Sequence, residues 1–187
     1  IMDIAGKNLK VIAEFGVGYD NIKVNDASER NIAVGNAPGV LTETTADFSF
    51  AVIQSAARRL AESDRFVRNG QWKWFDPLDL LGIDINGSTL GIIGFGRIGK
   101  SVAKRALASG MNVIYFTRST PDDDFGCKRI NDLEELLKIS DFVSLHCPLT
   151  DETKNLIGTH ELEIMKPTSV LVNTSRGPTV DTNALSE

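Results

Sequence analysis

Three glycines in the middle of the chain have the spacing of a turn that binds a dinucleotide: Gly94, Gly96 and Gly99. They follow an apolar run typical of a buried strand and open a segment with helical periodicity, as a βαβ dinucleotide site requires. The first glycine would allow the tight turn, the second would let the backbone approach the pyrophosphate, and the third would let the helix pack on the strand. The pyrophosphate would bind to N–H groups at the helix start, near Arg97 and Ile98. The motif predicts a dinucleotide cofactor; the alternative is a glycine turn without a ligand.

The end of the next strand indicates which dinucleotide binds. Enzymes that use NAD usually carry an acidic residue there, about 20 residues after the glycines, which bonds the ribose 2′-OH. This chain has Thr117 at that position, followed by Arg118 and Ser119. A guanidinium pairs with a 2′-phosphate, whereas a carboxylate would repel it. We therefore predict NADP(H) in preference to NAD(H); the alternative is that Arg118 stacks on the adenine or faces solvent.

Alternating strands and helices must position these residues. The expected strands are 88–94, 112–116, 141–146 and 169–173, and the expected helices are 97–109, 132–139 and 151–165. This alternation is typical of an α/β fold with a doubly wound parallel sheet. We assign residues 41–187 to a Rossmann-type NAD(P)-binding domain.

The residues before this domain follow a different pattern. Residues 1–40 contain two expected strands, 9–15 and 31–36, which are too few to close a core. We therefore expect them to be the remnant of a second domain. A long helix from Thr42 to about Arg68 carries an apolar stripe, and we expect the stripe to pack against another domain or a partner chain. The stripe consists of Phe48, Val52, Ala56 and Leu60, and Ala51 and Ile53 widen it.

Composition excludes several classes of function. The chain has 187 residues and a formal net charge of -5, which gives no electrostatic footprint for nucleic acid or an anionic membrane. No apolar run approaches the length of a membrane span, which is about 20 residues. The two cysteines, Cys127 and Cys147, lie outside any metal-binding spacing, so we expect no metal, reduced thiols and a cytoplasmic protein.

Several blocks together resemble the D-isomer-specific 2-hydroxyacid dehydrogenase family. They include GVGYDNI, NAPGVLTETTADF, LGIIGFGRIGK, SDFVSLHCPLTDETKNLI and MKPTSVLVNTSRGPTVD, in the order of the family. The lack of an acidic residue at Thr117 resembles the glyoxylate and hydroxypyruvate reductase branch. The resemblance implies an enzyme that reduces a small 2-keto acid to the D-2-hydroxy acid with NADP(H). It also implies that residues 1–40 belong to a flavodoxin-like substrate domain.

The resemblance implies roles for individual residues. Backbone N–H groups at Val17 and Gly18 would hold the substrate carboxylate. Arg176 would be the catalytic residue, because a guanidinium can bind the adjacent carboxylate and keto oxygens in one plane and stabilise the developing alkoxide. Besides the glycine turn, the implied cofactor-binding residues are Thr117, Arg118, Ser119, His146, Cys147, Pro148, Thr153, Thr174, Ser175 and Arg176.

The family also uses a histidine proton donor with a carboxylate partner, in a block after NTSRG. This chain contains His146 and His160, and we expect neither to be the donor. We therefore expect the chain to be truncated at both ends, with the catalytic histidine and glutamate beyond residue 187. The resemblance further implies a homodimer, formed through the helix from Thr42 and the aromatic segment 69–75. The alternatives are an NAD-dependent relative such as phosphoglycerate dehydrogenase, a corepressor, and a non-catalytic dinucleotide-binding paralogue.

Overall fold

The computed structural model describes residues 1–186, and the chain divides into two compact units, Ile1–Thr42 and Glu43–Glu187. The first unit contains two parallel strands, β1 (Val11–Ala13) and β2 (Ala33–Gly35). Its helices are α1 (Met2–Ala5), the short 3-10 helix η1 (Gly6–Asn8) and α2 (Val24–Glu29). Its buried apolar side chains, Ala27 and Ile32, make a small core.

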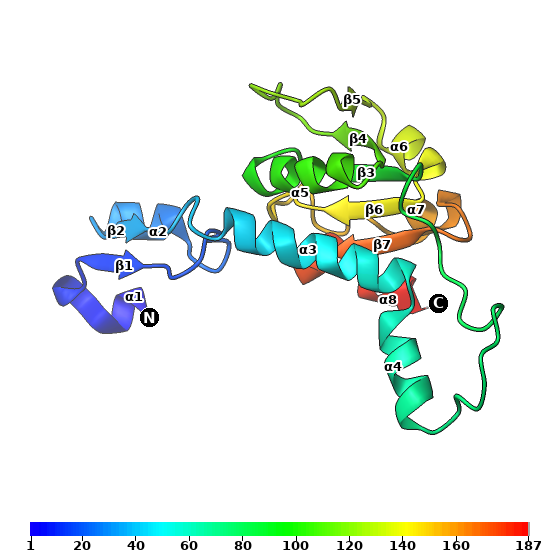
Figure 1. The fold of residues 1–187 in the computed structure, drawn as a ribbon. Helices are drawn as coiled ribbons and strands as arrows, with labels where there is room; N and C mark the ends of the chain where they lie inside the picture. The colour runs from blue at the N-terminus through cyan, green and yellow to red at the C-terminus, as the bar shows by residue number, and fades with distance from the viewer. Residues whose placement is uncertain (187) are drawn as a thin grey trace. The chain divides into compact units, whose positions relative to one another are not determined.

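The second unit contains a five-stranded parallel sheet (Figure 1). Its strands are β3 (Thr89–Ile93), β4 (Asn112–Phe116), β5 (Lys128–Arg129), β6 (Phe142–Leu145) and β7 (Val170–Asn173). The order across the sheet is β5-β4-β3-β6-β7, and every neighbouring pair is parallel. The prediction of a doubly wound parallel sheet is confirmed. The strand order reverses between β3 and β6, which is where such sheets bind ligands, at the carboxyl ends of the strands.

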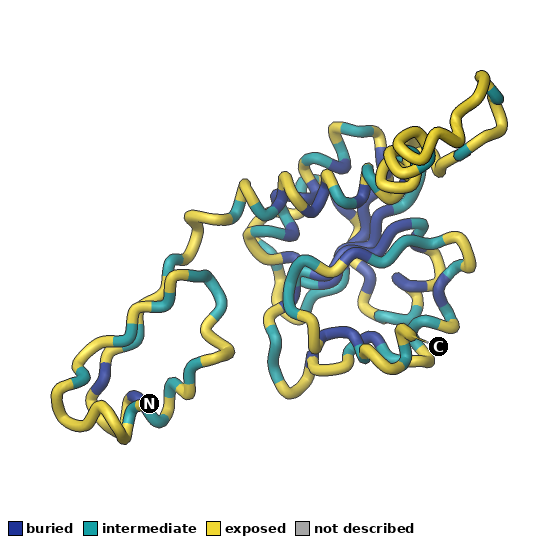
Figure 2. The backbone as a smooth tube through the Cα atoms, turned by 90° about the horizontal axis from the view of Figure 1, so that it is seen from below, coloured by how far each residue is buried: buried dark blue, intermediate teal, exposed yellow. Residues whose placement is uncertain are grey.

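Helices cover both faces of this sheet. They include α3 (Thr42–Ala57), α5 (Arg97–Ala108), α6 (Leu133–Ile139) and α7 (Thr159–Ile164). The unit also contains α4 (Leu60–Arg68), which projects away from the sheet in Figure 1, the 3-10 helix η2 (Gly177–Thr179) and α8 (Thr182–Ser186). Helices α3 and α5 share one core cluster with the sheet, whereas α6 and the residues around α7 share the other. The two clusters form the buried centre of the unit in Figure 2. Within residues 1–186, none of the helices combines the length and apolar character that a membrane crossing needs.

Strand β3 separates the two clusters by its alternation. Leu90 and Ile92 belong to the cluster with α3 and α5, while Ile93 belongs to the cluster with α6. All three side chains are at most 1% exposed. A strand buried on both faces is an apolar run without polar interruptions, which explains why the run before the glycine turn is continuous.

The prediction of one helix from Thr42 to Arg68 is wrong. The chain breaks at Arg59, which adopts a left-handed conformation with φ 51° and ψ 37°. The carbonyl of Ala57 accepts a hydrogen bond from the N–H of Ile83, at 2.8 Å, so the loop before β3 replaces the next helical turn. Two helices, α3 and α4, therefore stand where one was expected.

The expected stripe on this helix is only partly buried: Ile53 is fully buried and Val52 packs against the core, whereas the ends of the stripe are exposed. The buried face of α3 consists of Ala46, Ser49, Phe50, Ile53 and Ala57. Phe48 is 63% exposed and Leu60 is 55% exposed. Both faces of the helix carry apolar side chains, so periodicity could not decide which one packs on the sheet.

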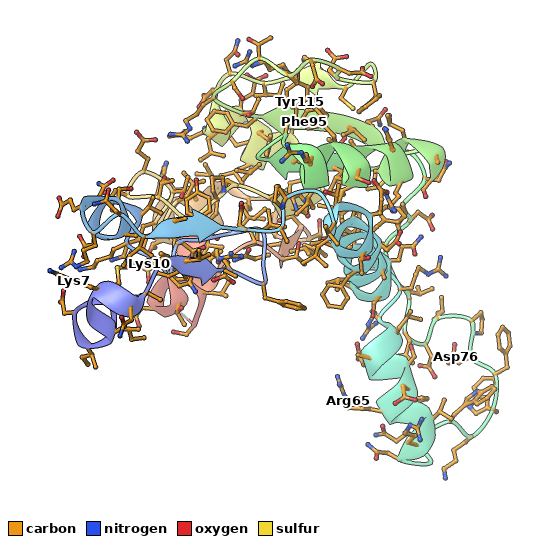
Figure 3. The ribbon with its side chains drawn as sticks, turned by 90° about the vertical axis from the view of Figure 1, so that its left-hand side faces the viewer. Lys7, Lys10, Arg65, Asp76, Phe95 and Tyr115 are labelled. Carbon is orange, nitrogen blue, oxygen red and sulfur yellow. The ribbon has the colours of Figure 1, made fainter. Side chains whose placement is uncertain are left out.

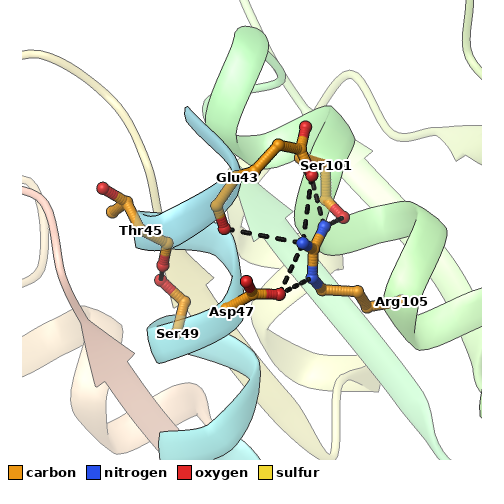
Figure 4. Close-up of polar contacts among 6 residues, drawn as sticks. All are labelled: Glu43, Thr45, Asp47, Ser49, Ser101 and Arg105. Atoms are coloured by element: carbon orange, nitrogen blue, oxygen red, sulfur yellow. Dashed lines mark hydrogen bonds and ion pairs between the residues drawn. The ribbon is translucent and has the colours of Figure 1, made fainter. Parts of the chain in front are cut away.

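A polar network holds the first turns of α3 against α5 (Figure 4). The Arg105 guanidinium donates to Asp47 Oδ1, with Nε at 2.8 Å, and to Glu43 Oε2, with Nη2 at 3.0 Å. Ser101 Oγ donates to Glu43 Oε2 at 2.8 Å. The Ser101 hydroxyl, and then Arg105, hold the pKa of Glu43 below its usual range. The network fixes the orientation of α3 relative to the helix that follows the glycine turn.

Candidate functional site

The glycine turn begins at Gly94, directly after β3. Gly94 has φ 93°, a conformation that side chains rarely adopt. A Cβ atom at this position would lie 2.5 Å from the backbone nitrogen of Cys147, which follows the neighbouring strand β6. The Gly94 N–H donates to the carbonyl of Phe116, at 2.9 Å, on the strand at the other side. Glycine is therefore required at this position, because the turn lies directly against the ends of β4 and β6.

The other two glycines lie in different surroundings. A Cβ at Gly99 would lie 2.2 Å from the carbonyl oxygen of Gly94, so this glycine allows α5 to start close to the turn. A Cβ at Gly96 would meet no atom within 4 Å. Gly96 is the residue before the first turn of α5, where backbone N–H groups point out of the helix and attract anions. The open space at Gly96 is therefore where a pyrophosphate would fit.

A cavity of about 760 Å³ opens at this turn, at the carboxyl ends of β3, β4 and β6. Its volume is in the range of cofactor sites, which is about 300–1,000 Å³. Nine of the predicted cofactor residues line it: Gly94, Gly96, Thr117, Arg118, Ser119, His146, Cys147, Pro148 and Thr153. Five further lining residues had no predicted role: Ile93, Phe95, Phe116, Glu152 and Leu156.

Phe95 lines the cavity and packs against strand β4. Its ring stacks on the ring of Tyr115, with centroids 4.0 Å apart and planes 18° apart; both rings are labelled in Figure 3. Phe95 is 3% exposed and Tyr115 is 2% exposed, and burial raises the pKa of the tyrosine. The residue between the first two glycines therefore ties the turn to strand β4. The glycine pattern contains no signal for this contact, because the middle position of the motif is open to any residue.

Two charges of opposite sign meet in the cavity, one from the segment after β4 and one from the segment after β6. Arg118 is the second residue after β4, as the sequence predicts, and its Nη1 pairs with Oε2 of Glu152. Glu152 comes from the turns after β6, 34 residues away in the sequence. The sequence reasoning missed this carboxylate, because the acidic residue was sought beside Thr117 at the strand end.

The segment 148–155 lines the cavity after β6 with Pro148, Glu152 and Thr153. Thr153 Oγ1 donates to the carbonyl of Pro148 at 2.6 Å and accepts from the N–H of Thr150 at 2.8 Å. The hydroxyl of Thr153 therefore stabilises this segment, which brings Glu152 to the cavity. The expected helix over 151–165 is correct only for α7, since residues 151–155 form turns.

His146 is unsuited to donate a proton at neutral pH. Its Nε2 lies 2.8 Å from Ser144 Oγ, and burial lowers the pKa of its imidazole to about 4. His160 has an acidic neighbour that the sequence did not reveal, because its Nε2 lies 3.2 Å from Glu134 Oε1. That pair is exposed between α6 and α7 and does not line the cavity. Neither histidine is therefore placed as the proton donor of this cavity.

The segment after β7 carries Thr174, Ser175 and Arg176, which do not line the cavity. Thr174 Oγ1 lies 2.7 Å from Oγ of Ser49, a fully buried residue of α3. Ser49 Oγ in turn donates to the Thr45 carbonyl, at 2.7 Å, within the helix (Figure 4). Arg176 is half-buried, and its Nη1 donates to the carbonyl of Ser175 at 3.0 Å. Helix α3 thus holds the loop that presents Arg176.

The remaining predicted residues lie outside the cavity. Arg97, Ile98 and Gly99 form the first turn of α5. Val17 and Gly18 belong to the first unit, in the loop after β1, where the Val17 carbonyl accepts from Asn36 Nδ2 at 2.7 Å. Within the described part of the chain, no group of three or more His, Cys, Asp or Glu side chains is placed to hold a metal ion.

Comparison with known proteins bears on this site. A family model described as the D-isomer specific 2-hydroxyacid dehydrogenase, NAD binding domain, matches residues 50–187. The chain is 52% identical over 184 residues to a glyoxylate reductase of Thermococcus litoralis, covering 95% of this chain and 55% of that protein. It is also 52% identical to a glyoxylate reductase of Korarchaeum cryptofilum, over 97% of this chain and 55% of that protein. The chain therefore spans about half the length of these relatives.

A solved structure agrees with these matches. The TT0316 protein from Thermus thermophilus superposes with a TM-score of 0.92 at 48% identity, over 98% of this chain and 58% of that one. The family model covers the whole glycine turn and the cavity residues described above. The chain belongs to the D-isomer-specific 2-hydroxyacid dehydrogenases, and its second unit corresponds to their NAD-binding domain.

Proposed function

We propose that the protein carrying this chain reduces a small 2-keto acid of the glyoxylate or hydroxypyruvate type, with NADP(H) as cofactor. One observation carries the cofactor preference: Thr117 stands where NAD enzymes place a carboxylate, and Arg118 and Ser119 line the cavity beside it. The Arg118 guanidinium and the Ser119 hydroxyl would both be able to bind a 2′-phosphate at this position. The glyoxylate reductase names of the relatives support the substrate class.

We assign the binding of the cofactor to the glycine turn and the ends of β4 and β6. The first turn of α5 would hold the pyrophosphate at Gly96, Arg97 and Ile98. The bound nicotinamide would supply the hydride. His146 and Cys147 would exclude water from the cavity, since both side chains are desolvated and neither is charged at neutral pH; burial raises the pKa of the Cys147 thiol.

We assign the substrate to Arg176 and to the loop at Val17 and Gly18, with residues 1–40 as part of the substrate domain and residues 41–187 as the cofactor domain. The Arg176 guanidinium would grip the carboxylate and keto oxygens and stabilise the developing alkoxide. Thr174 and Ser175 would present the same loop to the cofactor. As the resemblance implies, the proton donor is proposed to be a histidine outside these residues, paired with a glutamate.

A homodimer is part of the proposal. The face of α3 away from the sheet, helix α4 and the segment after it expose large apolar side chains: Phe48, Leu60, Val67, Trp72, Trp74 and Phe75. Exposed apolar patches of this kind are typical of subunit contacts. Light scattering on the intact protein tests the dimer, and a monomer at micromolar concentration would refute it.

Steady-state kinetics of the intact protein test the activity. We expect turnover of glyoxylate or hydroxypyruvate, with kcat/KM for NADPH at least about tenfold above that for NADH, the size expected for one charge-assisted contact. The variant Arg176→Lys keeps the charge but loses the planar fork, so turnover should fall while NADPH binding persists. A reversed cofactor preference would favour the NAD-dependent alternative. NADPH binding without any turnover would favour a non-catalytic paralogue.

A further inference from the structure

The Arg118–Glu152 ion pair lies in the part of the cavity that would receive the adenosine ribose. Arg118 and Glu152 are the residues with formal charges among those described as lining the cavity. We propose that Glu152 sets the balance between NADP(H) and NAD(H), by competing with the 2′-phosphate for the Arg118 guanidinium. This inference rests on the proposed function, because it concerns the dinucleotide in the same cavity.

The two partners approach from opposite sides of the strand-order reversal. Arg118 follows β4, and Glu152 lies in the turns after β6, with β3 and its glycine turn between them. The bonds of Thr153 to Pro148 and Thr150 hold the segment that carries Glu152. These bonds hold the backbone at Glu152, and its carboxylate reaches the arginine that the 2′-phosphate would use.

Binding of a 2′-phosphate to the Arg118 guanidinium competes with the ion pair. A phosphate binds a guanidinium best through two parallel N–H donors, and Glu152 occupies the Nη1 donor. A carboxylate left at this position would also repel the dianionic phosphate. The two side chains are 64% and 69% exposed, so Glu152 can turn into solvent and the pair contributes little by itself. The carboxylate therefore weakens NADP(H) binding without preventing it.

Binding of a ribose without the phosphate leaves the pair intact. In NAD enzymes a carboxylate at the strand end accepts a hydrogen bond from the 2′-OH. Glu152 offers the same group from a different strand end, while Arg118 stays neutralised. The site can therefore bind either dinucleotide: Arg118 favours the 2′-phosphate of NADP(H), and Glu152 favours the ribose 2′-OH of NAD(H).

Equilibrium binding to the intact protein tests the inference. Dissociation constants for NADPH and NADH are measured by quenching of protein fluorescence, for the wild type and for Glu152→Gln. The control Glu163→Gln removes the same charge from an exposed position outside the cavity. We expect Glu152→Gln to shift the NADPH-to-NADH affinity ratio about tenfold toward NADPH, which corresponds to about 1.4 kcal/mol. The control should leave the ratio within about twofold, as for surface charge changes.

A double-mutant cycle with Arg118→Gln tests the competition itself. If Glu152 acts through Arg118, its replacement should change the ratio much less in the Arg118→Gln background. An unchanged ratio in Glu152→Gln, or an equal shift in both backgrounds, would overturn the inference. A wild type that prefers NADH, together with a Glu152→Gln variant shifted toward NADPH, would refute only the proposed NADP preference. A wild type that binds neither dinucleotide would overturn the proposed function and this inference together.

Discussion

Replacing Gly94 by alanine is expected to destabilise the fold, whereas the same change at Gly96 is expected to weaken dinucleotide binding and leave the fold intact. At Gly94 the backbone has φ 93°, and the new Cβ would lie 2.5 Å from the backbone nitrogen of Cys147 and 2.7 Å from the carbonyl carbon of His146. These neighbours are backbone atoms beside β6, which cannot move without disturbing the sheet. Gly96 has φ -81°, and its Cβ would point into open space.

The magnitudes follow from these surroundings. A side chain in a sparsely populated backbone region costs about 1–3 kcal/mol, and the overlap with β6 adds to this, so the Gly94→Ala variant should lose about 3 kcal/mol or more. For a unit of this size that corresponds to a melting temperature lowered by about 6–12 °C. At Gly96 an alanine loses some preference for the helix N-terminal position, about 0.5 kcal/mol, and gains a similar amount from a less flexible unfolded chain. Its melting temperature should therefore change by less than about 2 °C.

Thermal unfolding followed by circular dichroism, without added cofactor, measures the first effect, and NADPH titration measures the second. Gly96→Ala should weaken NADPH binding at least about tenfold, because its methyl group occupies the space for the pyrophosphate. A Gly94→Ala variant that melts within about 2 °C of the wild type would refute the argument from close packing. A Gly96→Ala variant with unchanged NADPH affinity would show that the pyrophosphate does not lie at this turn.

Three further predictions concern stability. The pKa of the His146 imidazole is about 4 in the folded chain, whereas its ordinary value is 6.5. Between these pH values the unfolded chain binds a proton that the folded chain does not. The contribution of His146 to the free energy of unfolding is therefore complete above pH 6.5 and is lost as the pH falls toward 4. In urea unfolding, the free energy of unfolding of the wild type should fall by about 2 kcal/mol more between pH 7 and pH 5 than that of the His146→Asn variant. Equal decreases in the two proteins would contradict this prediction. Ser49→Ala removes the buried partner of Thr174 and should cost about 1–2 kcal/mol, whereas Ser55→Ala, on a less buried part of α3, should cost less than about 0.5 kcal/mol. Arg105→Ala breaks the network with Glu43 and Asp47, and should lower the melting temperature more than Arg58→Ala, whose partner Asp84 lies 3.9 Å away; equal changes would show that the network does not stabilise α3.

The local patterns of the sequence determined the order of the elements and the glycine turn. Apolar runs of strand length alternate with helical periodicity from Thr89 onward, and the structure confirms the parallel sheet that this alternation predicts. The roles of Gly94 and Gly99 follow from backbone geometry within one βαβ unit, which a spacing motif can encode. Arg118 was placed by its distance from the same motif, and it lines the cavity. The assignment of Arg176 and the substrate loop stays a prediction.

Only the tertiary structure decided which residues meet across the sheet. Glu152 reaches Arg118 over 34 positions, and Ser49 reaches Thr174 over 125 positions, so no local period could indicate either contact. Helix α3 carries apolar side chains on both faces, and only the packing on the sheet selected Ala46 and Phe50 for burial. The low pKa of His146 arises from the desolvation of its ring, a property of its surroundings that its neighbours in sequence do not contain. The sequence therefore determined which elements form, because short-range geometry governs them, and the fold determined the electrostatics of the site, because charges interact through space.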